Sequence, residues 1–488
     1  MSEQKARPRA RVEYRLGEDG EPTMVNVGIE GLRIGSDVEL AGLVADELSG
    51  LHGEVVHSEG EFWRFDGTRW VVIPETEIRL ICHRYDGAPF GTKMTIRLGK
   101  NRINSILNEL AAILEQRDFF ANVPLGINCA AGFIAFENGE PTLLPHAPDY
   151  RCRHVLQGRW PINPALDVVR ESLLSQLLRG CFLCDDDAEA KIHLLAEIAG
   201  AAALGYATRL RKPKAVVLVG TTAENGKSQI LDLLRGLLPA SAISSLPLGK
   251  FDEDRYVVQL AGKLLNASDE LTSAAAIPAD AFKRIITGEP TMGRDVYRNA
   301  LTFRPIAQHV FATNDLPSFR GGMDRGVLRR LLVITFNRMI PEDERKEHIG
   351  QRIAHEEADL LLDFAVQGAS RLIKRRYFEE PASSTDALNE WLIGADPVVA
   401  WLEEAVAIVA GMDPPKVQIG TAYGRFREWA VAQGYAEATL PSVKTFVQRV
   451  VNAGGTRGVG RRRDSKGRYL TGIMLDKLSQ QTAFSARG

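Results

Sequence analysis

Short apolar runs separated by polar residues dominate the first 150 residues of the chain. The segments 61–73 (EFWRFDGTRWVVI) and 132–139 (GFIAFENG) have the composition and alternation of strands. In residues 103–116 (INSILNELAAILEQ), by contrast, the apolar positions recur at helical spacing. This mixture predicts a small α/β domain over residues 1–155.

Between Pro164 and Leu210 the pattern becomes that of amphipathic helices. Segments 166–180 and 188–210 each place apolar residues at helical spacing, and together they predict a helical collar over residues 156–212. Three carboxylates stand before the second helix, where they suit the positive end of the helix dipole. Helix capping is therefore favoured over a metal site for Asp185, Asp186 and Asp187.

Buried strands follow the collar and define a core over residues 213–375. The runs AVVLV (215–219), HVFAT (309–313) and LLVITF (331–336) are apolar and too short for helices. Helices resume after about residue 340, and the turn-forming residues of PASST (381–385) are typical of a linker.

The last region, residues 376–488, predicts a helical linker and one further domain. Segments 421–435 and 441–454 have helical spacing, and 456–475 is typical of a two-stranded hairpin. Helix, helix and hairpin is the order of a winged helix-turn-helix.

Composition narrows the class of protein without naming a function. The 488 residues include 45% hydrophobic and 25% charged residues, and no apolar run approaches the roughly 18 to 20 residues that span a membrane. The polar, basic start MSEQKARPRARVEYR lacks the apolar segment of a secretion signal, so we expect a cytoplasmic protein without membrane contact. The net charge of -2 neither indicates nor excludes a nucleic-acid partner.

Two sets of residues allow more than one interpretation. The five cysteines are too few for a disulfide framework, and the Cys181–Cys184 CxxC lacks a second ligand pair for zinc, so we expect reduced thiols. An aromatic cluster in the first domain could stack bases, but packing between strands is favoured. Its members are Phe62, Trp63, Phe65 and Trp70.

The strongest chemical motif lies between the strand 215–219 and the helix that follows it. A glycine-bearing loop before a helix N-terminus directs backbone N–H groups at phosphates, a lysine reaches the β and γ oxygens, and a serine holds Mg²⁺. The first glycine stands at Gly220, one place before the usual position, which Thr221 occupies. The residues that predict this nucleotide site are Gly220, Asn225, Gly226, Lys227 and Ser228.

Hydrolysis also requires a metal-supporting acid and a group that orients water. Asp269 and Glu270 end the run LAGKLLNASDE, and we predict that Asp269 supports Mg²⁺ while Glu270 polarises water. Asn314 follows HVFAT at the position of a water-orienting sensor. A surface turn is the alternative for each of these segments.

The order of these motifs resembles the superfamily 3 helicases of the phage and plasmid primase-helicase and poxvirus-type lineage. It stands here as NGKS (225–228), DE (269–270), FKRIITGEPTMGRDVYRN (282–299) and FATNDLP (311–317), followed by DRGVLRRLLVITF, and the resemblance covers roughly residues 60–475. It implies an AAA+-like P-loop core that forms a ring, usually a hexamer, with ATP at subunit interfaces. It also implies a DNA-contacting hairpin at 282–299, in which Lys283, Arg294 and Arg298 would line the central channel and grip the backbone of single-stranded DNA.

The resemblance also assigns a trans-acting arginine. Arg329 and Arg330 are the candidates for a finger that stabilises charge on the transferred phosphoryl group, with Arg325 a weaker one. A solvated basic patch before a core strand is the alternative. The primase half that is often fused upstream in this lineage has no candidate metal ligands before residue 150, so priming would need a separate primase or polymerase.

A local excess of positive charge favours DNA contact by the last domain. From Lys444 to Arg468 eight basic residues face one acid, Asp464, and Arg461, Arg462 and Arg463 lie on the predicted wing. The sequence thus predicts an ATP- and Mg²⁺-dependent ring helicase acting on single-stranded and duplex DNA in mobile-element replication. An origin-binding initiator or scaffold that uses ATP as an assembly switch is the main alternative, and a packaging or defence NTPase is a third.

Overall fold

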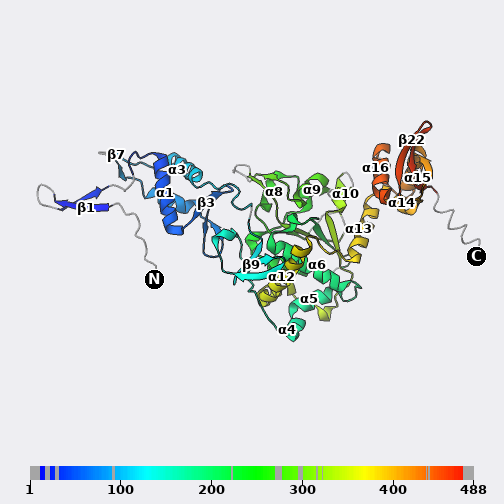
Figure 1. The fold of residues 1–488 in the computed structure, drawn as a ribbon, viewed down its shortest axis with the longest axis horizontal. Helices are drawn as coiled ribbons and strands as arrows, with labels where there is room; N and C mark the ends of the chain where they lie inside the picture. The colour runs from blue at the N-terminus through cyan, green and yellow to red at the C-terminus, as the bar shows by residue number, and fades with distance from the viewer. Residues whose placement is uncertain are drawn as a thin grey trace, which may run out of the picture. The chain divides into compact units, whose positions relative to one another are not determined.

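The computed structural model divides into two compact units, residues 1–161 and 162–488. Figure 1 shows the elements of each unit in chain order. The structure describes residues 11–16, 22–27, 32–90, 94–121, 123–220, 222, 224–269, 277–294, 301–314, 317–320, 323–435, 437 and 440–475.

The first unit is a small α/β assembly, as its alternating pattern predicted. Helix α1 packs against α3 over an apolar core that includes Leu40, Ile78 and Ile106. Ser36 caps α1 by accepting a hydrogen bond from the Glu39 backbone N–H at 3.2 Å. The helices are α1 (Asp37–His52), α2 (Glu75–His83) and α3 (Lys100–Ile113).

The strands of the first unit pair in antiparallel fashion. Two three-stranded sheets have the orders β3-β4-β5 and β10-β9-β8, and β1-β2 and β6-β7 form short pairs. The strands are β1 (Arg11–Leu16), β2 (Pro22–Val27), β3 (Val55–Ser58), β4 (Glu61–Phe65), β5 (Trp70–Val72), β6 (Pro89–Phe90), β7 (Met94–Thr95), β8 (Gly126–Cys129), β9 (Gly132–Glu137) and β10 (Glu140–Leu144).

The aromatic cluster of this unit packs inward. Trp70 is buried against Phe119, and Phe62 is buried in the helical core. Trp63 and Phe65 are partly buried beside Trp70. The packing interpretation is therefore confirmed for Phe62 and Trp70.

A five-stranded parallel sheet organises the second unit. Its order is β12-β13-β17-β11-β19, so β11 lies between β17 and β19 and hydrogen-bonds to both. Helices cover the sheet in Figure 1, which explains why its longer strands are apolar without alternation. The strands are β11 (Ala215–Val219), β12 (Ile243–Ser244), β13 (Leu265–Ser268), β17 (Gln308–Thr313) and β19 (Leu331–Thr335).

Helices and short strands complete this core. They are α4 (Leu166–Glu171), α5 (Leu173–Phe182), α6 (Ala188–Leu204), α7 (Lys227–Gly236), α8 (Asp254–Val257), α9 (Ala279–Ile286), α10 (Arg325–Leu328), α11 (Ile349–Glu356), α12 (Ala358–Arg375) and α13 (Ala382–Ala395). Two short pairs lie outside the main sheet: β14 (Ile277–Pro278) with β18 (Phe319–Arg320), and β15 (Thr291–Gly293) with β16 (Leu301–Phe303).

Two local predictions in this core were wrong. The segment 166–180 is not one helix, because Ser172 adopts an extended conformation, ends α4 and caps α5 by accepting from the Ser175 N–H. The 381–385 segment is not a linker, because Pro381 starts α13 and Ser384 is buried. Helix α13 packs on β19, and its Trp391 belongs to the apolar core.

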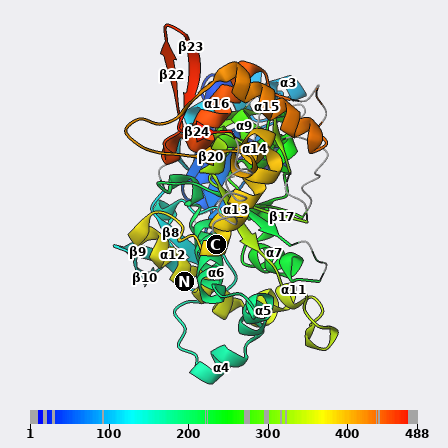
Figure 2. The ribbon, with the colours of Figure 1, turned by 90° about the vertical axis from the view of Figure 1, so that its right-hand side faces the viewer.

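The C-terminal elements surround a separate apolar core that contains Trp401, Phe426 and Phe446. The predicted helices and hairpin are confirmed, but β21 adds a third strand in the order β21-β23-β22. Figure 2 shows β22 and β23 extending from the helices beside them. The elements are α14 (Pro397–Glu404), β20 (Ala407–Ile408), β21 (Lys416–Gln418), α15 (Ile419–Ala432), α16 (Val443–Gly454), β22 (Gly460–Asp464), β23 (Gly467–Thr471) and β24 (Ile473–Met474).

Across the part of the chain that the structure describes, every helix is too short or too polar to cross a membrane.

Helices α6 and α12 meet at glycines, and this contact yields a stability prediction. A Cβ at Gly368 would lie 1.8 Å from the Ala196 carbonyl oxygen, and one at Gly200 would lie 2.3 Å from the Ala369 nitrogen. We expect Gly368→Ala to lower the free energy of unfolding by about 1–3 kcal/mol through overpacking. The exposed helical Gly394 has no neighbour within 4 Å of its Cβ position, so Gly394→Ala should not destabilise. Chemical denaturation of both variants measures this, and equal stabilities would contradict it.

Candidate nucleotide-binding cleft

The loop between β11 and α7 requires glycine at two places. Gly226 has φ +88°, and a Cβ there would lie 2.4 Å from the Cys181 Sγ. A Cβ at Gly220 would lie 2.2 Å from the Asn225 Nδ2 and 2.8 Å from the Phe336 carbonyl oxygen. Thr221, which occupies the usual position of the first glycine, lies outside the described residues. The structure therefore shows only the surroundings of Gly220, where Asn225 and Phe336 leave no space for a side chain.

Lys227 begins α7 and turns back over the loop. Its Nζ donates to the Gly220 carbonyl oxygen at 2.9 Å and to Asn225 Oδ1 at 3.1 Å, while Asn225 Nδ2 donates to the Thr222 carbonyl oxygen at 2.6 Å. Burial lowers the pKa of Lys227. Ser228 is exposed in the first turn of the helix, where free N–H groups suit an anion.

A cleft of about 430 Å³ brings the loop together with two of the other predicted residues. Asp269 follows β13 and Asn314 follows β17, and both strands end at the same edge of the sheet as β11. Glu270 lies outside the described residues. The lining residues are Glu224, Asn225, Gly226, Lys227, Ser228, Gln229, Asp269, Ala312, Thr313 and Asn314.

Arg235 is a neighbour of the cleft that sequence reasoning missed. From α7 its Nη1 pairs with Asp269 Oδ2 at 3.0 Å, and its Nη2 donates to the Ala267 carbonyl oxygen at 3.2 Å. In the sequence, Arg235 stands three residues after Asp232, and this spacing is typical of an ordinary ion pair on a helix surface. The ion pair with Asp269 depends on tertiary structure, so no local pattern predicted it.

The arginine candidates differ in exposure. Arg330 is 8% exposed, and its Nη1 donates to the Gly326 carbonyl oxygen at 2.6 Å. Arg329 is exposed at the end of α10, and Arg325 donates to the Asn452 carbonyl oxygen at 3.2 Å. Among the described residues that line the cleft, none is an arginine. Of the two main candidates, Arg329 is the exposed one and Arg330 the buried one.

The basic residues predicted to grip DNA do not share one hairpin. Lys283 was placed there wrongly: it lies on α9, and its Nζ pairs with Asp280 at 3.1 Å and Asp324 at 3.0 Å. The hairpin is formed by β15 and β16, and Arg294 directly follows β15. Arg298 lies outside the described residues.

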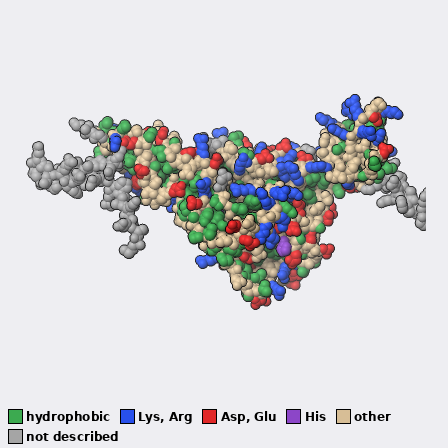
Figure 3. Space-filling view, in the orientation of Figure 1, with side chains coloured by type: hydrophobic (Ala, Val, Ile, Leu, Met, Phe, Trp, Pro, Cys, Tyr) green, Lys and Arg blue, Asp and Glu red, His purple; other side chains and the backbone are tan. Residues whose placement is uncertain are grey.

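The arginines of the C-terminal hairpin form an exposed basic strand. Arg461, Arg462 and Arg463 lie on β22, and Arg463 stands opposite Arg468 of β23. Figure 3 shows lysine and arginine side chains gathered on this C-terminal part. A surface of this kind suits phosphate groups.

Neither candidate metal motif has the geometry of a metal site. Within the described ranges, no group of three or more His, Cys, Asp and Glu residues is arranged to hold an ion. Cys181 is buried against the loop, whereas Cys184 is exposed. Asp187 is the N-cap residue of α6, at the position predicted for a cap, but its carboxylate makes no capping hydrogen bond to that helix within the described structure. Asp185 and Asp187 contact Lys191 instead.

Comparisons with known proteins show limited similarity. Residues 218–330 match the model of a family described as a family of unknown function (DUF5906). No curated protein matches the chain. An apo structure of the NrS-1 C terminal region (A form) is 13% identical with a TM-score of 0.43, and covers 86% of this chain and 96% of that one. A second structure of that region is 14% identical with a TM-score of 0.43, covering 90% and 100%. Because these identities and TM-scores are low, the function proposed below rests on the geometry of the cleft and not on these similarities.

The cysteine geometry predicts selective thiol reactivity. Burial raises the pKa of Cys181 to about 12 and of Cys152 to about 12, so their thiolate fractions at pH 8 are about one in ten thousand. We expect one fast-reacting thiol per chain with a disulfide reagent at pH 8, lost in Cys184→Ser and kept in Cys181→Ser. A fast phase that survives Cys184→Ser would contradict this.

Proposed function

We propose that the chain is an ATP-dependent, Mg²⁺-dependent DNA motor of the ring-helicase type. The observation that carries the proposal is the single cleft that joins Lys227, Asp269 and Asn314. A phosphate-binding loop, an acid and a polar group at the neighbouring strand end supply the parts that NTP hydrolysis requires.

The strand order supports an AAA+-like P-loop core. The loop-bearing strand β11 lies beside β17, with β13 and β12 beyond it on one side and β19 on the other. This arrangement sets the acid of β13 across β17 from the loop, and both line the same cleft. Ser228 and Asp269 are the residues that would hold Mg²⁺, which would neutralise charge on the β and γ phosphates.

The ring belongs to the proposal because no arginine stands among the described lining residues of the cleft, and Arg235 beside it is already paired with Asp269. An exposed Arg329 from a neighbouring subunit would stabilise the charge that develops in phosphoryl transfer. Contact with DNA would come from Arg294, which follows β15, from Arg298 and from the arginines of β22. The C-terminal domain, with two helices and a three-stranded sheet, supports a winged-helix assignment.

The first prediction from this proposal concerns the cleft. Lys227→Ala should lower ATPase activity by about a hundredfold or more, because it removes the cation for the β and γ phosphates. Asn314→Ala and Glu270→Gln should lower kcat while ATP still binds. Lys250 lies outside the cleft and pairs with Glu253 at 2.7 Å, so Lys250→Ala is the control. Steady-state ATPase assays measure these effects. A kcat at the parental value in Asn314→Ala would contradict a catalytic role for Asn314.

The second prediction tests hydrolysis between subunits. Lys227→Ala and Arg329→Ala proteins should each be inactive and should regain part of the ATPase activity when mixed, because some interfaces then pair an intact cleft with an intact arginine. Arg325→Ala, on the same turn, should keep its own activity. Rings that assemble from the mixture without any recovered activity would place the arginine elsewhere.

The third prediction concerns DNA. The triple variant Arg461→Ala, Arg462→Ala, Arg463→Ala should bind duplex DNA more weakly, with the slope of log affinity against log salt reduced by about 0.9 per lost phosphate contact. A matched double variant of Arg425 and Arg427, which pair with Glu428 and Glu437 on another face, should bind normally.

The same variants separate the motor from its main alternative. ATPase activity stimulated by single-stranded DNA should persist in the triple variant, because the cleft lies in a different part of the chain. If the parental protein binds duplex DNA in an ATP-dependent manner but displaces no strand, it is an initiator or scaffold that uses ATP as an assembly switch.

A further inference from the structure

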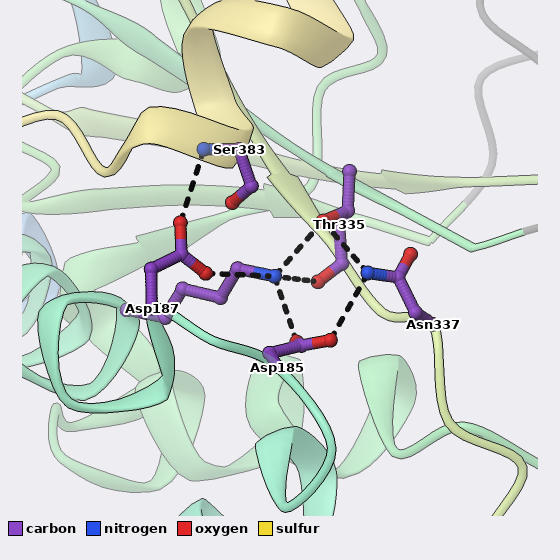
Figure 4. Close-up of polar contacts among 6 residues, drawn as sticks. Asp185, Asp187, Thr335, Asn337 and Ser383 are labelled. Carbon is purple, nitrogen blue, oxygen red and sulfur yellow. Dashed lines mark hydrogen bonds and ion pairs between the residues drawn. The ribbon is translucent and has the colours of Figure 1, made fainter.

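A completely buried lysine lies in helix α6. Lys191 has no exposed surface, although its side chain carries a charge. Its Nζ donates to Asp185 Oδ2 at 2.8 Å, to the Thr335 carbonyl oxygen at 3.0 Å and to Thr335 Oγ1 at 2.9 Å, as Figure 4 shows. These three bonds use all three protons of the ammonium group, which offsets the cost of burying it.

The lysine joins three segments that are distant in the sequence. Asp185 Oδ1 accepts from Asn337 Nδ2 at 3.1 Å, and Asp187 Oδ2 accepts from the Ser383 backbone N–H at 3.0 Å. Asp187 Oδ1 lies 3.7 Å from Lys191 Nζ. The turn between α5 and α6, the end of β19 and the start of α13 therefore meet at one charge; we call these residues the Lys191 cluster.

The segment that follows β19 contacts the nucleotide loop, residues 220–226. The Phe336 N–H donates to the Val219 carbonyl oxygen at 2.7 Å, and the Phe336 carbonyl oxygen approaches Gly220. Four residues later, the Ile340 N–H donates to the Glu224 carbonyl oxygen at 3.0 Å. Segment 335–340 thus lines one side of the loop.

Helix α5, which leads into the turn that carries Asp185 and Asp187, also contacts the loop. Cys181 packs against Gly226, and the Phe182 ring contacts the Phe336 ring at 5.0 Å between centroids. Lys191 Nζ lies 5.4 Å from the centre of the Phe182 ring. The two segments that enclose the loop are thus joined by Lys191, by the Phe182–Phe336 contact and by the hydrogen bond from Arg338 Nη1 to the Gly180 carbonyl oxygen at 2.7 Å.

We propose that Lys191 is a positioning residue for the nucleotide site, which sets the shape of the 220–226 loop by joining α5 to the end of β19. This inference rests on the proposed nucleotide-binding function. It implies coupling in both directions: a ligand that fixes the loop also fixes the turn between α5 and α6.

Helix α6 provides a matched control. Glu197 is also completely buried there, but its partners are Arg371, Arg375 and the Glu379 N–H, on or just after α12. Both residues are buried charges on the same helix, and their loss is expected to destabilise the fold. Of the two, Lys191 is the one whose partners lead to the loop.

The test compares Lys191→Met and Glu197→Gln in the full chain by amide hydrogen exchange and ATPase kinetics. Without nucleotide, Lys191→Met should speed exchange in a peptide covering residues 224–229, and it should raise KM for ATP about tenfold with kcat changed far less. Glu197→Gln should leave both quantities at the parental values. In the parental protein, ATP should slow exchange over residues 183–187, and Lys191→Met should abolish that protection.

A second variant keeps the test decisive if Lys191→Met fails to fold. Asn337 is exposed, so Asn337→Ala removes its two bonds to the cluster, to Asp185 Oδ1 and Thr335 Oγ1, without opening a cavity. It should shift exchange and KM in the same direction by a smaller amount. Unchanged loop exchange in the folded Lys191 or Asn337 variant, or equal effects from Glu197→Gln, overturns the proposal. A parental protein that binds no ATP refutes the proposed function instead, while the exchange comparison still decides the role of the cluster.

Discussion

Parallel pairing of β11 with β17 on one side and β19 on the other is the constraint on which the cleft depends. In a parallel sheet the carboxyl ends of all strands lie at one edge, so the residues that follow β11, β13, β17 and β19 lie near one another there. The loop, Asp269 and Asn314 come from three separate segments between residues 220 and 314. Their proximity is a property of strand order.

Around that edge, the loop takes its shape from tertiary neighbours. Gly220 is crowded by Asn225 and Phe336, and Gly226 is crowded by Cys181. Helix α5 and the segment after β19 therefore contribute to excluding side chains at these two positions. A glycine displaced by one position from the usual pattern is compatible with this arrangement, because Lys227 still reaches the Gly220 carbonyl oxygen.

Local periodicity sufficed to predict β11, β17, β19, α15 and α16, since each buries a continuous or regularly spaced set of apolar residues. It failed where a distant partner decides the outcome. Lys283 looked like a free cation until Asp324 was placed beside it. Asp187 stands at the N-cap position of α6, yet its carboxylate accepts from the distant Ser383 N–H. PASST has the composition of a linker, yet Ser384 is buried. Sequence patterns carry no information about such long-range pairs.

The ion pair between Arg235 and Asp269 has a consequence for how a metal ion would enter. A divalent cation that binds Asp269 competes with a guanidinium already 3.0 Å from the same carboxylate. In the proposed motor, Asp269 would bind a cation less tightly with Arg235 beside it than without it, because the two positive charges repel each other.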